Sequence, residues 1–198
     1  MLRVLMMVLL FAVPANAGVH YNEETKTATL YGTTTSAQWV WLNNLIASKE
    51  IRMLNLQGPG GDFYAGLAIG RLIRKHDFTV TIPKDTKCVS ACAWAALASR
   101  KIYVDGKMLI HRGYFMQMPT MSTLDEFARR SGAGMHDGTK YLVEMGYTFN
   151  FAKSVVVDST PCIFLDLGST AFVEQLRDPD PFSIKPNLAM GKVDTCNG

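Results

Sequence analysis

Residues 87–98 place one serine between two cysteines and continue as a run of alanine and other apolar residues. Small residues crowd Ser90 on both sides, and the residues that follow are strong helix formers. We therefore predict a buried helix from about Ser90 to Ser99, with the Ser90 hydroxyl near the free N–H groups of its first turn. A serine at this position suits two roles, a helix cap and a nucleophile beside an oxyanion hole.

The beginning of the chain has the pattern of a secretory signal peptide. Residues 1–3 carry a positive charge, residues 4–13 are an unbroken apolar run and residues 15–17 form a small-x-small cleavage site. The apolar run is too short and wrongly flanked for a membrane span, and no later stretch is apolar for long enough. We expect residues 1–17 to be removed and 18–198 to form one periplasmic or secreted domain; an uncleaved anchor is the alternative.

The charge of the chain bears on whether it binds nucleic acid. The formal net charge of +3 is spread along the chain without a basic run interleaved with aromatics, so nucleic acid is not an implied partner.

An even number of cysteines in an exported chain indicates disulfides. A zinc site needs two close ligand pairs, which the wide spacing of the later cysteines does not offer, so we expect no metal. The four cysteines are Cys88, Cys92, Cys162 and Cys196.

Four cysteines allow three pairings. Bonds between Cys88 and Cys92 and between Cys162 and Cys196 would clamp the serine loop and hold down the end of the chain. This pairing requires the Cα atoms of Cys88 and Cys92 to lie within about 7 Å of each other. The rival pairing joins Cys162 to Cys88 or to Cys92.

Strand-like and helix-like segments alternate along the first half of the chain, an order typical of α/β domains with βαβ crossovers. Strands are predicted at 28–32, 51–56, 78–82, 102–104 and 108–111, with helices at 36–49 (capped by Ser36), 65–76 and 90–99. The second half is predicted to hold helical pieces at 123–130 and 140–145, a short helix at 149–156, a strand at 162–167, a helix at 169–176 and a Pro/Asp-rich tail at 178–198.

Three features stand in order along this pattern: a Pro-Gly-Gly turn at 59–61, Ser90 at a helix start and His111 at a strand end. Singly, each has an ordinary structural explanation as a tight turn, a helix cap or a strand-end residue. Together they supply what acyl transfer needs, namely a nucleophile, a base and N–H donors. In this interpretation Ser90 attacks, His111 takes its proton, and the amides of Gly60 and Ala91 bind the oxyanion.

The order of these motifs resembles that of the Clp protease proteolytic subunit and its ClpP/crotonase superfamily. The matching segments are 55–61, 65–69, 88–92 and 108–111. The resemblance implies an α/β fold built as a spiral of ββα units. It also implies a serine peptidase or hydrolase without a cofactor, with a peptide or protein substrate and a trimer or larger ring. The exported form with cysteines around the serine is similar to periplasmic ClpP-like proteins. Carried over by residue, Ser90 is the nucleophile, His111 the base, and Gly60 and Ala91 the oxyanion donors.

The chain departs from that family in two places. The acid that orients the histidine has no clean counterpart; Asp158 and Asp166 bracket its expected position, and Asp158 is the preferred candidate, with a solvated loop charge as the alternative. A broken Gly-rich segment is expected where the family has a long helix.

Three other interpretations remain beside this one. A lysine base, as in signal peptide peptidase A, would come from Lys84, Lys87, Lys101 or Lys107, but His111 fills the family's base position. A crotonase-like use of coenzyme A does not suit an exported protein. The third is a non-catalytic ClpP-like module that binds peptides or assembles with a partner.

Overall fold

The computed structural model describes residues 17–112, 124–159, 163–177 and 191–194. Most of the predicted signal peptide and most of the predicted tail lie outside these residues, as do Cys162 and Cys196. Within the described part, none of the helices combines the length and apolar character that crossing a membrane requires.

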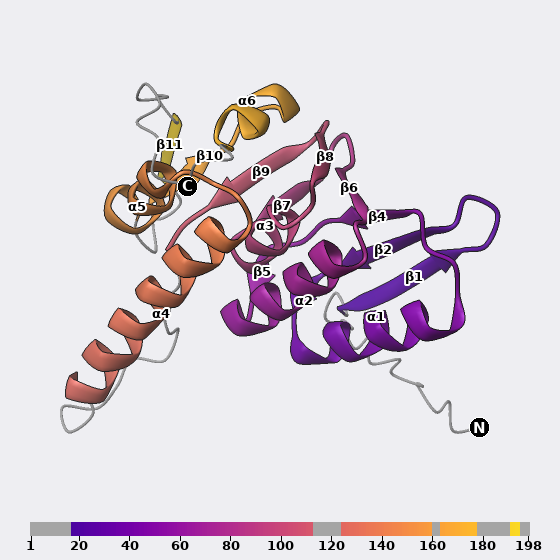
Figure 1. Ribbon diagram of the computed structural model, residues 1–198, viewed down its shortest axis with the longest axis horizontal. Helices are drawn as coiled ribbons and strands as arrows, with labels where there is room; N and C mark the ends of the chain where they lie inside the picture. Colours follow the sequence, from indigo (N-terminus) through magenta and orange to yellow (C-terminus); the bar gives the residue numbers. More distant parts are fainter. Residues whose placement is uncertain (1–16, 113–123, 160–162, 178–190, 195–198) are drawn as a thin grey trace, which may run out of the picture.

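A five-stranded sheet forms the body of the domain (Figure 1). Its first strand is antiparallel to the second, and the others run parallel. Alternating side chains of the parallel strands, such as Leu54, Val80 and Ile102, point into the core. In spatial order the strands are β1 (Gly18–Asn22), β2 (Thr27–Tyr31), β4 (Met53–Leu56), β6 (Thr79–Ile82) and β8 (Lys101–Val104).

Each parallel strand of this sheet is followed by a short second strand and then by a helix. The second strands are β3 (Thr33–Thr34), β5 (Gly60–Gly61), β7 (Lys87–Val89) and β9 (Lys107–Ile110). The helices are α1 (Ser36–Ser48), α2 (Phe63–Lys75), α3 (Ala91–Ala96) and α4 (Leu124–Glu144). The predicted mixed α/β class and the spiral of ββα units are therefore confirmed by the order of the chain's own elements.

The second strands bring the later part of the chain against the first. β3 pairs with β5, and β7 pairs in parallel with β9. β9 also pairs antiparallel with β10 (Ile163–Asp166), which pairs with β11 (Gly191–Asp194). The predicted short helix and final helix are present as α5 (Phe149–Asp158) and α6 (Thr170–Gln175). Strands β7, β9, β10 and β11 thus form a second sheet. Residues 191–194, expected in a surface tail, are its outer strand.

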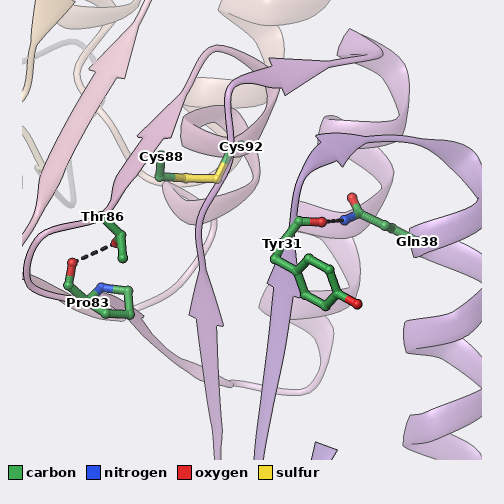
Figure 2. The surroundings of a disulfide bond; sticks show 6 residues. All are labelled: Tyr31, Gln38, Pro83, Thr86, Cys88 and Cys92. Carbon is green, nitrogen blue, oxygen red and sulfur yellow. Dashed lines mark hydrogen bonds between the residues drawn. A yellow bond between two sulfur atoms is a disulfide. The ribbon is translucent and has the colours of Figure 1, made fainter. Parts of the chain in front are cut away.

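α1, α2 and α3 lie side by side along one face of the five-stranded sheet (Figure 1). The predicted cap of α1 is wrong by one residue: Thr35 precedes the helix, and its hydroxyl accepts the N–H of Gln38. The buried Gln38 amide then donates to the carbonyl of Tyr31 at 2.7 Å (Figure 2). This bond holds α1 against the end of β2.

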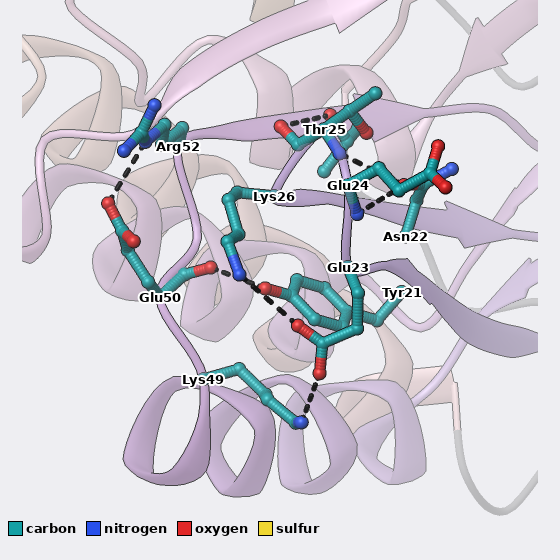
Figure 3. A network of polar contacts seen from close by, with 10 residues as sticks. Tyr21, Asn22, Glu23, Glu24, Thr25, Lys26, Lys49, Glu50 and Arg52 are labelled. Atoms are coloured by element: carbon teal, nitrogen blue, oxygen red, sulfur yellow. Dashed lines mark hydrogen bonds and ion pairs between the residues drawn. The ribbon is translucent and has the colours of Figure 1, made fainter.

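Charged side chains connect the β1–β2 turn to the end of α1 (Figure 3). Glu23 accepts hydrogen bonds from Lys26, at 3.3 Å, and from Lys49. The Tyr21 hydroxyl donates to the carbonyl of Glu50 at 2.7 Å. Water screens these exposed charges, so the network aligns the edge of the sheet with α1 more than it stabilises the fold.

The prediction of a broken segment in place of a long helix is wrong. α4 runs for 21 residues from Leu124 to Glu144 and projects from the body of the domain (Figure 1). Its C-terminal half is anchored by the buried Tyr141, and a Cβ at Gly138 would lie 2.9 Å from the Trp94 ring. Packing of this kind outweighs the cost of a helical glycine, about 1 kcal/mol.

Because α2 packs closely on α3, we predict that one added methyl group between them lowers stability substantially. A Cβ at Gly66 would lie 2.5 Å from the carbonyl oxygen of Ala91, a backbone atom that cannot move alone. We expect Gly66→Ala to lower the free energy of unfolding in urea by about 1–3 kcal/mol. The matched control is Gly132→Ala in α4, where, apart from the helix's own backbone, no atom of the described residues lies within 4 Å of the new Cβ. This control should raise stability by up to about 1 kcal/mol. Equal urea midpoints for the two variants would contradict the packing.

Candidate active site

Ser90 and His111 meet at the carboxyl ends of two neighbouring parallel strands. Ser90 follows β7 and His111 follows β9, with Val89 in register with Leu109. The Ser90 N–H donates to the carbonyl of Leu109 at 2.9 Å, which fixes the end of β7. The side chains then converge, with Ser90 Oγ 2.6 Å from His111 Nε2. In the neutral Nδ1–H tautomer of His111, the serine hydroxyl donates to Nε2.

The backbone of Ser90 is turned away from helical geometry. Its φ of 56° and ψ of −123° lie in a region that L residues rarely adopt, at a cost of about 1–3 kcal/mol. Ser90 occupies the predicted N-cap position of α3, but its side chain makes no cap hydrogen bond, and its hydroxyl contacts His111 instead. α3 accordingly begins at Ala91 and ends at Ala96, shorter than the predicted helix.

The glycine turn at 58–61 lies directly against Ser90. At Gly60, where φ is 93°, a Cβ would lie 2.5 Å from Ser90 Cβ and 3.1 Å from the Ala91 nitrogen. Only glycine fits there. Two backbone hydrogen bonds align the turn with β7, from Gly58 N–H to the Lys87 carbonyl at 2.7 Å and from Val89 N–H to the Gly58 carbonyl at 3.0 Å. The backbones of Gly60 and Ala91 therefore flank Ser90, and the Ala91 N–H opens α3, where no intrahelical acceptor exists.

His111 lies in an apolar setting. Its exposed fraction is 3%, and the ring of Phe164 meets the imidazole edge to face at 4.4 Å between centroids. Burial disfavours the charged imidazolium and lowers the pKa of His111 from 6.5 to about 4. The imidazole is therefore neutral at neutral pH, which is the form that accepts a proton from a hydroxyl.

Trp94 holds the backbone of His111, a contact that the sequence analysis missed. The indole N–H of Trp94 donates to the carbonyl of His111 at 2.9 Å, and the Trp94 side chain is only 1% exposed. Phe63 packs edge to face on the indole, while the Tyr141 hydroxyl donates to the Trp94 carbonyl at 3.0 Å. The available signal was one tryptophan four residues after Ser90 in an otherwise small and aliphatic run.

The end of α5 reaches the residue that follows His111. The buried Ser159 hydroxyl accepts the Arg112 N–H at 2.8 Å and donates to the carbonyl of Val155. Asp158 is the last residue of α5, and its side chain lies outside the described part of the structure, so its role as the orienting acid stays a prediction. The other candidate, Asp166, accepts the N–H of Gly168 at 2.9 Å in an exposed turn.

A disulfide between Cys88 and Cys92 encloses Ser90 (Figure 2). Their Cα atoms are 5.2 Å apart, within the reach that the favoured pairing required. This half of the favoured pairing is present, and it rules out a bond from either residue to Cys162. The proposed bond between Cys162 and Cys196 lies outside the described residues.

Neither a metal nor a lysine base is indicated by the described residues. No group of three or more His, Cys, Asp or Glu side chains among them gathers into a metal site. In the same part of the chain, the only side-chain partner found for the Ser90 hydroxyl is His111. Lys84, Lys87 and Lys107 instead line a hollow beside the site.

Comparison with known proteins adds little to the description of the site. No protein-family model matches the chain. No curated protein matches it either. Among solved structures, it is similar to a ClpP1 mutant from Listeria monocytogenes, with 18% sequence identity and a TM-score of 0.49 over 67% of this chain and 80% of that chain. At this level the likeness concerns the path of the backbone and says nothing of the chemistry.

The bond from Trp94 to His111 predicts a specific loss of stability. Trp94→Phe keeps an aromatic ring but removes the donor, which leaves a buried carbonyl without that hydrogen bond. We expect the free energy of unfolding in urea to fall by about 1–3 kcal/mol. The matched control is Trp41→Phe, since Trp41 is 46% exposed, and this change should stay within about 0.5 kcal/mol. Similar losses in both variants would show that the hydrogen bond is unimportant.

Proposed function

We propose that the protein is an exported ClpP-like serine peptidase that works through an acyl-enzyme, with Ser90 as nucleophile and His111 as base. The observation that carries the proposal is the 2.6 Å contact between Ser90 Oγ and His111 Nε2. The strained backbone of Ser90 adds support, because strain of this kind gathers at nucleophile turns. Export to the periplasm or outside the cell is supported by the signal-peptide pattern and by the disulfide.

The proposed reaction follows from the positions of four groups. Ser90 Oγ attacks the carbonyl carbon of a peptide bond while His111 Nε2 takes the hydroxyl proton. The N–H groups of Gly60 and Ala91 receive the negative charge that forms on the carbonyl oxygen. The imidazolium then gives its proton to the leaving amine, and the acyl group stays on Ser90. Water, deprotonated by His111, attacks this ester, and the released Ser90 oxygen takes the proton back.

The proposal includes an orienting acid and an assembly. Asp158 is proposed to orient His111, because the contact between Ser159 and Arg112 joins the end of α5 to the residue after the histidine. Assembly into a trimer or larger ring is also proposed, on the basis of the family resemblance.

Covalent labelling tests the proposed nucleophile. A fluorophosphonate probe should label the wild-type protein, and Ser90→Ala should reduce the labelling rate more than about 100-fold. Ser36→Ala is the matched control, since Ser36 is an exposed residue at the start of α1 and should label as the wild type does. Folded wild-type protein that takes up no probe at Ser90 would favour a non-catalytic module that binds peptides or assembles with a partner.

The lowered pKa of His111 predicts how the labelling rate depends on pH. Only the neutral imidazole accepts the Ser90 proton, so the rate should hold as the pH falls and decline through about pH 4. In the unfolded chain the pKa returns to about 6.5, so the unfolded state binds more protons between these values. The free energy of unfolding should therefore decrease as the pH drops through that window. A labelling rate that is already halved at pH 6.5 would contradict the effect of burial on His111.

A further inference from the structure

An open hollow of about 720 Å³ lies beside the candidate active site and contains neither Ser90 nor His111 among its lining residues. Its walls are the segments that follow β2, β4, β6 and β8, at 31–32, 57–59, 84–87 and 105–107. These four strands are parallel, so the hollow occupies the carboxyl edge of the five-stranded sheet. Ligands of open α/β sheets bind at that edge.

The charged groups of the hollow point to an anionic ligand. Lys84, Lys87 and Lys107 come from two of its walls and are exposed. Among the described residues, none of their ammonium groups forms an ion pair. Asp85 and Asp105 also line the hollow, so positive charge is in excess but not uniform.

Two walls of the hollow, 84–87 and 105–107, are in direct backbone contact with each other. The Thr86 hydroxyl donates to the carbonyl of Pro83 at 2.6 Å (Figure 2), and the Lys107 N–H donates to the carbonyl of Thr86 at 3.0 Å. At Gly106 a Cβ would lie 2.4 Å from the Pro83 oxygen, so the two loops are in backbone contact. Preformed walls lower the entropy lost when a ligand binds.

Two walls of the hollow continue directly into the candidate active site. Lys87 begins β7, which ends one residue before Ser90, and Gly58 precedes Gly60 by two residues. The hydrogen bond from Gly58 N–H to the Lys87 carbonyl joins these walls. At about 3.3 Å per residue of strand, Lys87 is on the order of 10 Å from Ser90 along β7.

We propose that this hollow binds acidic polypeptide segments, and that the substrates of the peptidase carry Asp or Glu close to the cleaved bond. The second part rests on the proposed function. Three ammonium groups spread over two walls of a hollow this size suit several spaced carboxylates rather than one small anion. Tyr31 and Pro59 offer apolar surface for the chain between those carboxylates, while Asp85 and Asp105 disfavour the dense charge of a polyphosphate or nucleic acid.

Direct binding tests the hollow independently of catalysis. The Ser90→Ala protein is titrated into a fluorescein-labelled peptide of alternating Glu and Ser, and into its Gln and Ser counterpart, by fluorescence polarisation at low salt. We expect the Glu peptide to bind at least about tenfold more tightly. The double variant Lys84→Gln/Lys107→Gln should weaken that binding about threefold to tenfold. Added salt should weaken it further.

Two single variants serve as controls of opposite kinds. Lys75→Gln removes an exposed lysine of α2 that lies outside the hollow and should leave binding unchanged. Asp85→Asn should tighten binding of the Glu peptide, and asparagine tolerates the φ of 61° found at Asp85. Equal affinity for the two peptides would overturn the proposal. Equal loss in the Lys75 and double variants would overturn it too, as would oligo-dT that binds more tightly than the Glu peptide.

The cleavage part is tested with the wild-type protein and a pair of internally quenched peptides that differ only in Glu or Gln around the scissile bond. We expect faster cleavage of the Glu peptide, and a smaller difference in the double lysine variant. If the probe labels Ser90 but the two peptides are cleaved equally, the substrate inference fails and the proposed function stands. If the Glu peptide binds the hollow but Ser90 takes up no probe, the proposed function fails and the binding site stands.

Discussion

The contact between the glycine turn at 58–61 and the start of α3 is the constraint on which the rest of the site depends. No side chain fits at Gly60, because its Cβ would overlap that of Ser90. The two backbone hydrogen bonds between Gly58 and β7 make this approach possible, and β7 in turn pairs with β9. One line of backbone contacts therefore sets the separation of the turn, the serine and the histidine. The helices α1 and α2 and the five-stranded sheet support that line.

Trp94 links this line of contacts to the second half of the chain. It belongs to α3, its indole holds the carbonyl of His111, and its own carbonyl accepts the Tyr141 hydroxyl from α4. From the second half of the chain, Phe164 of β10 also packs on the imidazole. Elements on both sides of residues 113–123 thus share the burial of His111, and that burial keeps its imidazole neutral.

Local signals carried most of what could be predicted. The sequence places Ser90 at a helix start and His111 at a strand end. The pairing of β7 with β9 then brings these two residues together. What depended on distant contacts was missed. The N-cap role of Ser90 was inferred from its neighbours in sequence. The orientation of its hydroxyl, however, depends on a histidine 21 residues later. The continuity of α4 was hidden by its glycines, because the packing of Gly138 against Trp94 is a tertiary effect. The partner of Trp94 and the role of Ser159 were hidden for the same reason.

The disulfide around Ser90 has a consequence for where the protein works. A bond between residues four positions apart closes a very small loop, so it restricts the unfolded chain by only about 2 kcal/mol. Its main effect is on the local shape of the loop that presents the serine. Reduction would therefore leave the domain folded and loosen Ser90, whose backbone is strained. The geometry of the site therefore depends on the redox potential around the protein as well as on its side chains.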